Sequence, residues 1–205
     1  RRQRQMCIRD SQNTLLLSPP GGGKTTLLRC ANFLDQAEDG TMVLDGQTYH
    51  LGHVRRTEMY EARRHTAFVF QNYNLFLNKT ALQNVTEGLI VARKMPRDEA
   101  EARAQKALEK VGLGNRGASY PNQLSGGQQQ RVAIGRALIT KPMLILADEP
   151  TGNLDSKSGG EVMELLQNVW KKMGKALVVI THDSRIARMA DRQFQICLLY
   201  TSDAA

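Results

Sequence analysis

The stretch from Leu144 to Pro150 constrains the fold most, because four apolar residues run directly into two adjacent carboxylates. A short, uninterrupted apolar run is typical of a strand that is buried on both faces in a parallel sheet. Open α/β sheets bind ligands at the carboxyl ends of such strands. Asp148 is therefore predicted to hold Mg²⁺, a hard cation that bridges phosphates, and Glu149 to accept a proton from an attacking water. Taken alone, the pattern also fits a strand end with two solvated acids.

Length and composition suit a single α/β domain. The chain has 205 residues, of which 41% are hydrophobic and 23% are charged, ordinary values for a soluble globular protein. The net charge is +8, but the basic residues are scattered and lack the aromatic interleaving of a nucleic-acid module, so no nucleic-acid partner is expected. Three distant cysteines form no metal-ligand spacing, and they fit a reducing cytosolic compartment.

Strand-like and helix-like patterns alternate along the rest of the sequence, which predicts an α/β fold with a mainly parallel sheet. Apolar or β-branched runs predict further strands at 15–17, 41–44, 66–70 and 176–180. A tight turn is expected at Asp45-Gly46. Helical spacing predicts helices at 81–94, 98–111, 128–139 and 158–173. A helical subdomain is therefore expected at about 80–140.

A glycine-rich segment that leads into a helix is the predicted phosphate site. Its glycines let backbone N–H groups face an anion, and the helix N-terminus adds its dipole. Lys24 is predicted to reach the β- and γ-phosphates and Thr25 to ligate Mg²⁺. The first glycine of the usual G-x-x-x-x-G-K-[ST] pattern is Ser18 here, a departure that could strain the turn. The residues assigned to ATP binding in this segment are Gly21, Gly22, Gly23, Lys24, Thr25 and Thr26.

The most specific motif is Leu124-Ser-Gly-Gly-Gln128. A serine at a helix cap followed by two glycines gives a helix start that can receive an anion. Further motifs stand in a fixed order around it: GGGKTT, VFQ ending at Gln71, LILADEP, Asn153-Leu-Asp155 and THD. Together they resemble the ATP-binding subunit of an ABC transporter, and the resemblance covers about Leu15 to Ile196.

The resemblance implies a P-loop NTPase core with a helical ABC signature subdomain, and it implies roles for individual residues. Gln71 would reach Mg²⁺ and face the membrane subunit, Asp148 would support Mg²⁺, and Glu149 would be the general base. His182 would contact the γ-phosphate, and Asp155 would lie in the loop that joins two protomers. The signature residues Ser125, Gly126, Gly127 and Gln128 would close the ATP site of a second subunit, so hydrolysis would require a homodimer.

The resemblance also implies cofactors, partners and a location. ATP and Mg²⁺ are the expected cofactors. The expected partners are transmembrane permease subunits, a second ATPase subunit and, for an importer, a periplasmic or lipoprotein substrate-binding protein. The expected place is the cytoplasmic face of a bacterial inner membrane, where the protein would be peripheral.

The ABC domain is expected at 12–196, with 1–11 and 197–205 as non-native ends. Members of the family carry two strands and an adenine-stacking aromatic residue upstream of the phosphate loop. No aromatic residue precedes Phe33 in this sequence. The N-terminal strands are therefore expected to be truncated.

Different parts of the sequence resemble two different subfamilies of ABC transporter ATPases. Phe70–Phe76, Asn84-Val85 and Ala118–Pro121 resemble polar amino-acid uptake ATPases. Thr151–Ser156 and Val179–Asp183 resemble ATPases of lipoprotein release and macrolide export. We favour amino-acid uptake, because residues 70–90 would contact the membrane partner. A soluble ABC ATPase of DNA repair or translation is a further alternative, but such proteins usually carry a long coiled-coil insertion or a second ATPase copy.

Overall fold

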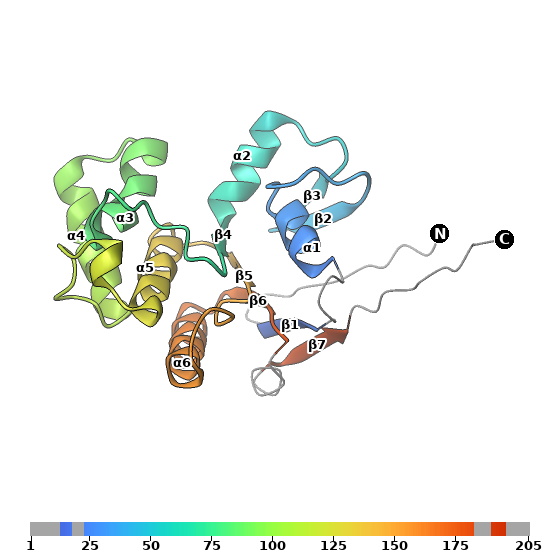
Figure 1. The fold of residues 1–205 in the computed structure, drawn as a ribbon. Coiled ribbons are helices and arrows are strands. Elements are labelled where there is room, and N and C mark those ends of the chain that lie inside the picture. The colour runs from blue at the N-terminus through green and yellow to red at the C-terminus, as the bar shows by residue number, and fades with distance from the viewer. Residues whose placement is uncertain (1–12, 18–22, 183–189, 196–205) are drawn as a thin grey trace.

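A parallel sheet forms the centre of the protein, as the sequence predicts (Figure 1). The computed structural model describes residues 13–17, 23–182 and 190–195. The sheet has five strands in the order β4-β5-β6-β1-β7, and every pairing between neighbours is parallel. Its strands are β1 (Asn13–Leu17), β4 (Thr66–Val69), β5 (Leu144–Asp148), β6 (Ala176–Ile180) and β7 (Arg192–Gln195).

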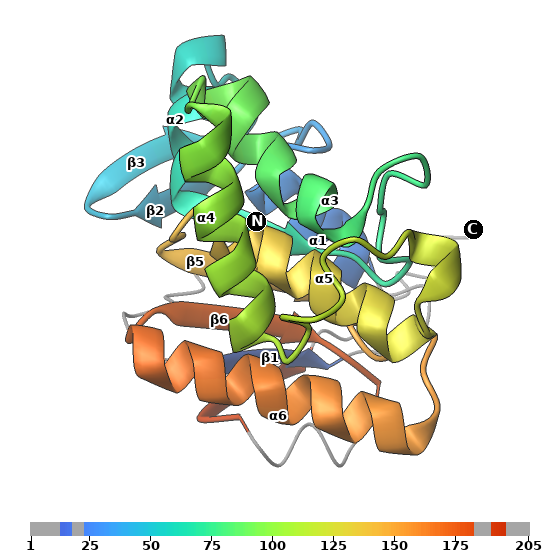
Figure 2. The same cartoon turned by 90° about the vertical axis from the view of Figure 1, so that its left-hand side faces the viewer.

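Strands β5 and β6 are buried along their whole length because helices cover both faces of the sheet. Ile145 and Ala147 pack in the larger core cluster with helices α5 (Gly126–Leu138) and α6 (Ser156–Met173). Leu144 and Leu146 belong to a second cluster around Leu28 of α1 (Lys24–Ala31). Alternate side chains thus point to opposite apolar layers, which explains why the run in the sequence is uninterrupted. Figure 2 shows α5 and α6 in front of the sheet.

The predicted helices of the 80–140 region form and pack on one another, at the left of Figure 1. They share buried residues such as Val85, Leu108 and Ile134. The helix predicted at 81–94 changes character at Gly88, where a π-helical turn replaces α-helix, a feature that residue spacing does not reveal. The elements are α3 (Ala81–Glu87), the π-helix η1 (Gly88–Ala92), α4 (Arg97–Lys110), the 3₁₀ turn η2 (Pro121–Gln123) and α5.

A hairpin and a short helix complete the other side of the sheet. Strands β2 (Thr41–Leu44) and β3 (Gln47–His50) are antiparallel and joined by Asp45 and Gly46, whose φ angles are 52° and 74°. Two positive φ angles are typical of the two-residue hairpin turn, so the predicted tight turn is confirmed. Helix α2 (Arg56–His65) was not predicted, because Ala62 is its only buried residue and it has no apolar stripe.

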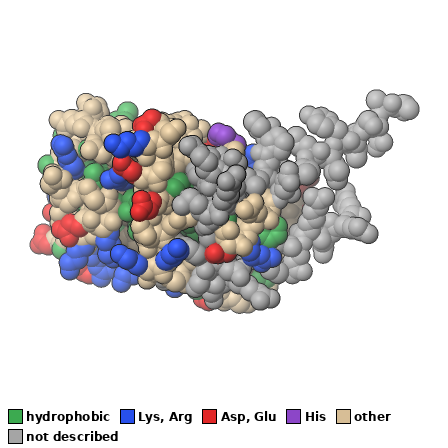
Figure 3. Space-filling view, turned by 90° about the horizontal axis from the view of Figure 1, so that it is seen from below, with side chains coloured by type: hydrophobic (Ala, Val, Ile, Leu, Met, Phe, Trp, Pro, Cys, Tyr) green, Lys and Arg blue, Asp and Glu red, His purple; other side chains and the backbone are tan. Residues whose placement is uncertain are grey.

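The surface carries both signs of charge. Figure 3 shows acidic and basic side chains on the same face, with Lys and Arg most numerous along one edge. In the part of the chain that the structure describes, no helix combines the length and the apolar character needed to cross a bilayer.

Candidate functional site

The start of α1 and the end of β5 meet, which brings the two predicted phosphate and metal segments together. Gly23, with a φ of 74°, adopts a backbone conformation that favours glycine and leads into Lys24, the first residue of α1. The Thr25 hydroxyl donates a hydrogen bond to Oδ1 of Asp148 over 3.0 Å. Lys24 is only 5% exposed, and Thr26 lies on the exposed side of the helix. Gly21 and Gly22 lie outside the described residues.

Asp148 sits in an environment that disfavours its charged form. Burial raises the pKa of this carboxyl, and the hydrogen bond from Thr25 partly opposes that effect. The neighbouring Glu149 raises the pKa further, whereas Arg29 and Lys24 lower it. A bound divalent cation would supply the missing positive charge, which is the behaviour expected of a metal-supporting carboxylate.

Glu149 and His182 lie side by side at the carboxyl ends of β5 and β6. His182 Nδ1 stands 3.3 Å from Oε2 of Glu149, and the His182 side chain is 62% exposed. Glu149 has a φ of 43°, a region that costs a non-glycine residue roughly 1–3 kcal/mol. Its N–H donates to the carbonyl of Ile180 over 3.0 Å, which helps to hold the strained residue. A carboxylate beside an imidazole can accept a proton from water, and the role of Glu149 as general base stays a prediction.

Gln71 approaches this pair from the end of β4. A Cβ atom added to Gly152 would stand 2.7 Å from Nε2 of Gln71 and 3.3 Å from Oε2 of Glu149. The absence of a side chain at Gly152 therefore lets the amide and the carboxylate approach the same point. Gln71 Nε2 donates to Oδ1 of Asn153 over 3.3 Å.

The donor set fits Mg²⁺ better than a softer metal. A hydroxyl from Thr25, a carboxylate from Asp148 and an amide oxygen from Gln71 are hard oxygen ligands, and Mg²⁺ usually takes few protein ligands beside phosphate and water. Among the described residues, no group of three or more His, Cys, Asp or Glu side chains is placed to hold a metal. These three oxygens would hold Mg²⁺, which would neutralise phosphate charge.

The predicted signature forms the N-terminus of α5. Ser125 is the N-cap: its hydroxyl accepts from Gln128 N over 3.3 Å, and the Gln128 side chain accepts from Ser125 N over 3.0 Å. Gly127 lies against Ser158, 3.2 Å from the place of its missing Cβ. No hydrogen bond between described residues joins the signature to Thr25 or Asp148 of the same chain. The expected completion of an ATP site by another subunit remains a prediction.

Asp155, predicted in the loop between protomers, has a local role in this chain. Its Oδ1 accepts from the backbone N–H groups of Lys157 and Ser158, each over 3.0 Å, at the start of α6. These hydrogen bonds, that from Ser158 first, lower the pKa of the carboxyl. Asp155 therefore caps α6 whether or not it meets a second protomer.

Several residues that support the site were not predicted. Tyr73 and Asn74 have φ angles of 59° and 49°, and Arg136 of α5 donates to both their carbonyls, over 3.0 Å and 2.7 Å respectively. The fully buried Gln130 donates its amide to the carbonyls of Phe70 and Pro150, at 3.2 Å and 2.8 Å. A positive φ at a residue other than glycine has no recognisable sequence pattern, and neither has a side-chain hydrogen bond to a distant backbone carbonyl. These contacts therefore could not be predicted from one sequence.

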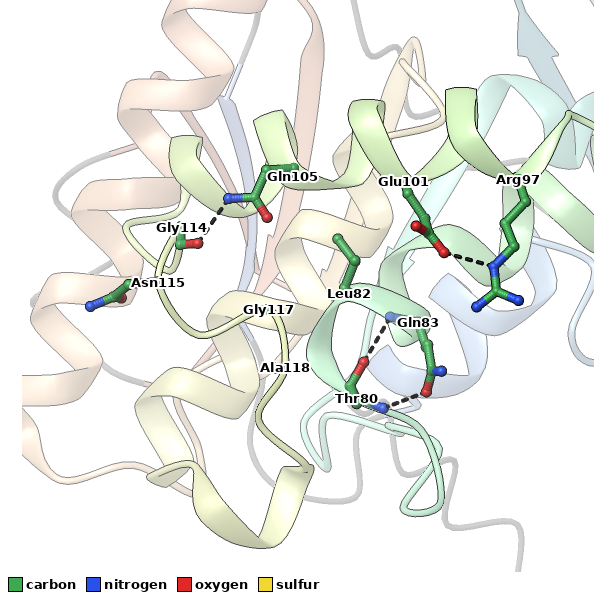
Figure 4. Close-up of a pocket in the computed structure, with 10 residues that line it drawn as sticks. All are labelled: Thr80, Leu82, Gln83, Arg97, Glu101, Gln105, Gly114, Asn115, Gly117 and Ala118. Atoms are coloured by element: carbon green, nitrogen blue, oxygen red, sulfur yellow. Dashed lines mark hydrogen bonds and ion pairs between the residues drawn. The ribbon is translucent and has the colours of Figure 1, made fainter.

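A separate hollow lies in the helical layer and shares no residue with the predicted site (Figure 4). It has a volume of about 440 Å³. Many of its polar groups pair with each other, as Arg97 does with Glu101 over 2.7 Å and Gln105 with the Gly114 carbonyl over 2.8 Å. The residues that line it are Thr80, Leu82, Gln83, Arg97, Glu101, Gln105, Gly114, Asn115, Gly117 and Ala118.

Comparison with known proteins agrees with this geometry. Residues 2–152 match the family described as ABC transporter. The L-cystine import ATP-binding protein TcyN of Bacillus subtilis is 41% identical over 188 residues, which cover 92% of this chain and 72% of that protein. The lipoprotein-releasing system ATP-binding protein LolD of Bordetella avium is 43% identical over 182 residues, covering 88% of this chain and 78% of that protein.

A solved structure shares the fold. The dimeric ATP-binding cassette MJ0796, in a post-hydrolysis state bound to ADP and Pi, is similar with a TM-score of 0.82 and 38% identity. The similarity covers 93% of this chain and 83% of that one. Because the family match spans most of the chain and the relatives align over nearly all of it, the protein belongs to the ABC transporter ATP-binding family.

Proposed function

We propose that this chain is the ATP-binding and ATP-hydrolysing subunit that powers an ABC transporter. The hydrogen bond between Thr25 and Asp148, at 3.0 Å, carries the proposal, because it joins the phosphate segment to the carboxylate strand. Lys24 would neutralise phosphate charge, and Thr25, Asp148 and Gln71 would hold Mg²⁺. Glu149 would take a proton from the attacking water, with His182 next to it at 3.3 Å.

The proposal is tested by exchanging the carboxylate of Glu149 for an amide. Glu149→Gln keeps the shape of the side chain but removes the base, so we expect ATP turnover to fall at least ~10²-fold while ATP binding is largely retained. Lys24→Ala should instead weaken ATP binding itself, because it removes a charge-assisted contact with phosphate. Steady-state phosphate release and calorimetric titration measure the two effects. Equal turnover in Glu149→Gln and parent would refute the assigned base.

The transporter is proposed to import amino acids. Relatives named for L-cystine import and glutamine transport support this choice, as does the amino-acid-uptake character of Phe70–Phe76. Phe76 and Leu77, which are 45% and 78% exposed, would contribute to contact with the permease subunits. The similarity to LolD favours lipoprotein release as the second candidate.

The two candidates differ in the partner that stimulates hydrolysis. An importer would work with permease subunits and a substrate-binding protein on the other side of the membrane, with this chain on the cytoplasmic face. We expect ATPase activity of the assembled complex to rise when the binding protein carries an amino acid. Stimulation by a lipoprotein substrate without any binding protein would favour the exporter instead.

A further inference from the structure

Asn153 lies between two segments of the candidate site and contacts Gln71 twice. Its Nδ2 donates to the backbone carbonyl of Gln71 over 3.3 Å and to Oδ1 of Asn72 over 2.6 Å. Its Oδ1 accepts from Nε2 of Gln71 over 3.3 Å. The Asn153 carbonyl also accepts from the Tyr73 hydroxyl over 3.4 Å. The loop between β5 and α6 is thereby joined to the segment that follows β4.

The chemistry of these contacts fixes the orientation of both amides. A backbone carbonyl can only accept, so the group of Asn153 that faces the Gln71 carbonyl must be the NH₂ group. Oδ1 of Asn153 then points to the Gln71 side chain and requires a donor, which only Nε2 can supply. Oε1 of Gln71 must therefore face the other way, and within the described residues it has no hydrogen-bond partner.

The orientation matters because only one end of the Gln71 amide can bind a cation. An amide oxygen is a hard ligand suited to Mg²⁺, whereas an NH₂ group directed at the ion would repel it. The amide lies near Glu149, since the place of the missing Cβ of Gly152 is 2.7 Å from Gln71 Nε2 and 3.3 Å from Glu149 Oε2. A free Gln71 side chain could turn its amide over at little cost, because that torsion is broad and roughly two-fold.

From this geometry we propose that Asn153 is a positioning residue that selects the oxygen of Gln71 for Mg²⁺. The inference rests on the proposed ATPase function and on Gln71 as a metal ligand. Asn153 itself does not touch the metal. Its two hydrogen bonds to Gln71 couple the position of the loop between β5 and α6 to the orientation of the Gln71 amide.

The proposal predicts a specific loss in Asn153→Ala. The dissociation constant of the non-hydrolysable analogue AMP-PNP is measured by calorimetry with MgCl₂ and with EDTA, and the ratio of the two values gives the Mg²⁺ enhancement. We expect the enhancement to fall about 2- to 10-fold, the range for loss of one hydrogen bond. Binding in EDTA should stay unchanged, because the amide pair acts only through the metal. Asn115→Ala, at an exposed asparagine of the hollow in Figure 4, is the matched control and should behave as the parent.

A double-mutant cycle separates positioning from a general structural role. Gln71→Ala leaves no side-chain amide at this position, so nothing remains for Asn153 to orient. In the Gln71→Ala background, Asn153→Ala should therefore leave the Mg²⁺ enhancement unchanged. An equal fall in both backgrounds, or no fall in Asn153→Ala alone, would overturn the inference. A parent chain whose AMP-PNP binding ignores Mg²⁺ would contradict the proposed function itself.

Discussion

At the scale of single residues, two aspartates of the site are set in opposite electrostatic environments. Burial raises the pKa of Asp148 above its ordinary value of 3.8. Hydrogen bonds from the start of α6 lower the pKa of Asp155 below the same value. Because the pKa of Asp148 is raised, folding favours its protonated form. The contribution of Asp148 to folding stability is therefore fully present below pH 3.8 and is lost as the pH rises through the folded pKa. The contribution of Asp155, whose pKa is lowered, is instead lost as the pH falls through its folded pKa.

The two aspartates should therefore respond oppositely to replacement by asparagine. Asp148→Asn should raise the melting temperature at neutral pH without nucleotide, because it removes a buried charge but keeps an acceptor for Thr25. Its gain should disappear as the pH falls below 3.8, where the carboxyl becomes protonated in both states. Asp155→Asn should lower the melting temperature at neutral pH, and this effect should shrink only below pH 3.8, as the pH falls through the lowered folded pKa. Thermal unfolding between about pH 2 and pH 7.5 measures both effects; parallel pH profiles of the two variants would contradict the assignment.

Two glycines offer a matched pair for testing close packing. A Cβ at Gly126 would meet the Tyr73 hydroxyl at 2.8 Å and Leu154 Cδ2 at 3.2 Å, whereas a Cβ at Gly160 of α6 would meet nothing within 4 Å. Gly126→Ala should stabilise the protein less than Gly160→Ala, or destabilise it, because the ends of the Tyr73 and Leu154 side chains must move aside. Gly160→Ala should raise the free energy of unfolding by about 0.5–1 kcal/mol, because alanine loses less backbone entropy in a helix.

Urea unfolding of the two alanine variants checks these values. The ATPase activity should fall in Gly126→Ala, because the displaced Tyr73 follows Gln71 closely in the chain. It should stay near that of the parent in Gly160→Ala. Equal stabilisation of both variants would mean that the signature glycine is not held against Tyr73.

At the scale of elements, α5 links the signature to the turn at Tyr73 and Asn74 that follows β4. Ser125 caps its first turn, and Arg136 near its end donates to the carbonyls of Tyr73 and Asn74. Those two residues hold positive φ angles of 59° and 49° without glycine, a strain of roughly 1–3 kcal/mol each. The guanidinium offsets that strain with two charge-assisted hydrogen bonds.

Arg136→Met should release the turn, since it keeps the apolar stem but loses both donors. We expect the free energy of unfolding to fall by roughly 1.5–3 kcal/mol, the range for hydrogen bonds of charged groups. Amide exchange at 72–76 should speed up more than exchange in α4. Arg116→Met, at an exposed arginine, is the control and should change neither quantity. Unaltered exchange at 72–76 in Arg136→Met would show that the turn does not depend on Arg136.

Elements with an apolar pattern could be predicted from the sequence, whereas those held by polar contacts could not. The run at Leu144 gave the buried strand, and the capping pattern at Ser125 gave the start of α5. Helix α2 escaped prediction because it buries only Ala62. The same contrast holds inside the site. Lys24 and Asp148 could be predicted because they stand in recognisable sequence motifs. The links through Asn153 and Arg136 depend on which carbonyls the fold brings near, which no local pattern encodes.

At the scale of the whole molecule, the two predicted halves of an ATP site lie on separate parts of one chain. One half is the phosphate segment with Asp148, and the other is the signature at the start of α5. Thr25 and Asp148 are joined by a hydrogen bond, while the signature cap packs on Tyr73, Leu154 and Ser158. Two solved structures of MJ0796, to which this chain is similar, are dimeric. A two-fold dimer would give each nucleotide the phosphate segment of one copy and the signature of the other.

A mixing experiment tests this arrangement. Lys24→Ala removes a phosphate contact, and Ser125→Asp keeps a good N-cap but sets a negative charge against the γ-phosphate. With Glu149→Gln also present to slow hydrolysis, neither chain alone should retain labelled ATP through rapid gel filtration. In a 1:1 mixture half of the dimers are mixed, and each mixed dimer has one site with both intact halves, so about a quarter of the parental retention should return. If each site were completed within one chain, mixing would restore nothing, because every site would still contain one of the two substitutions.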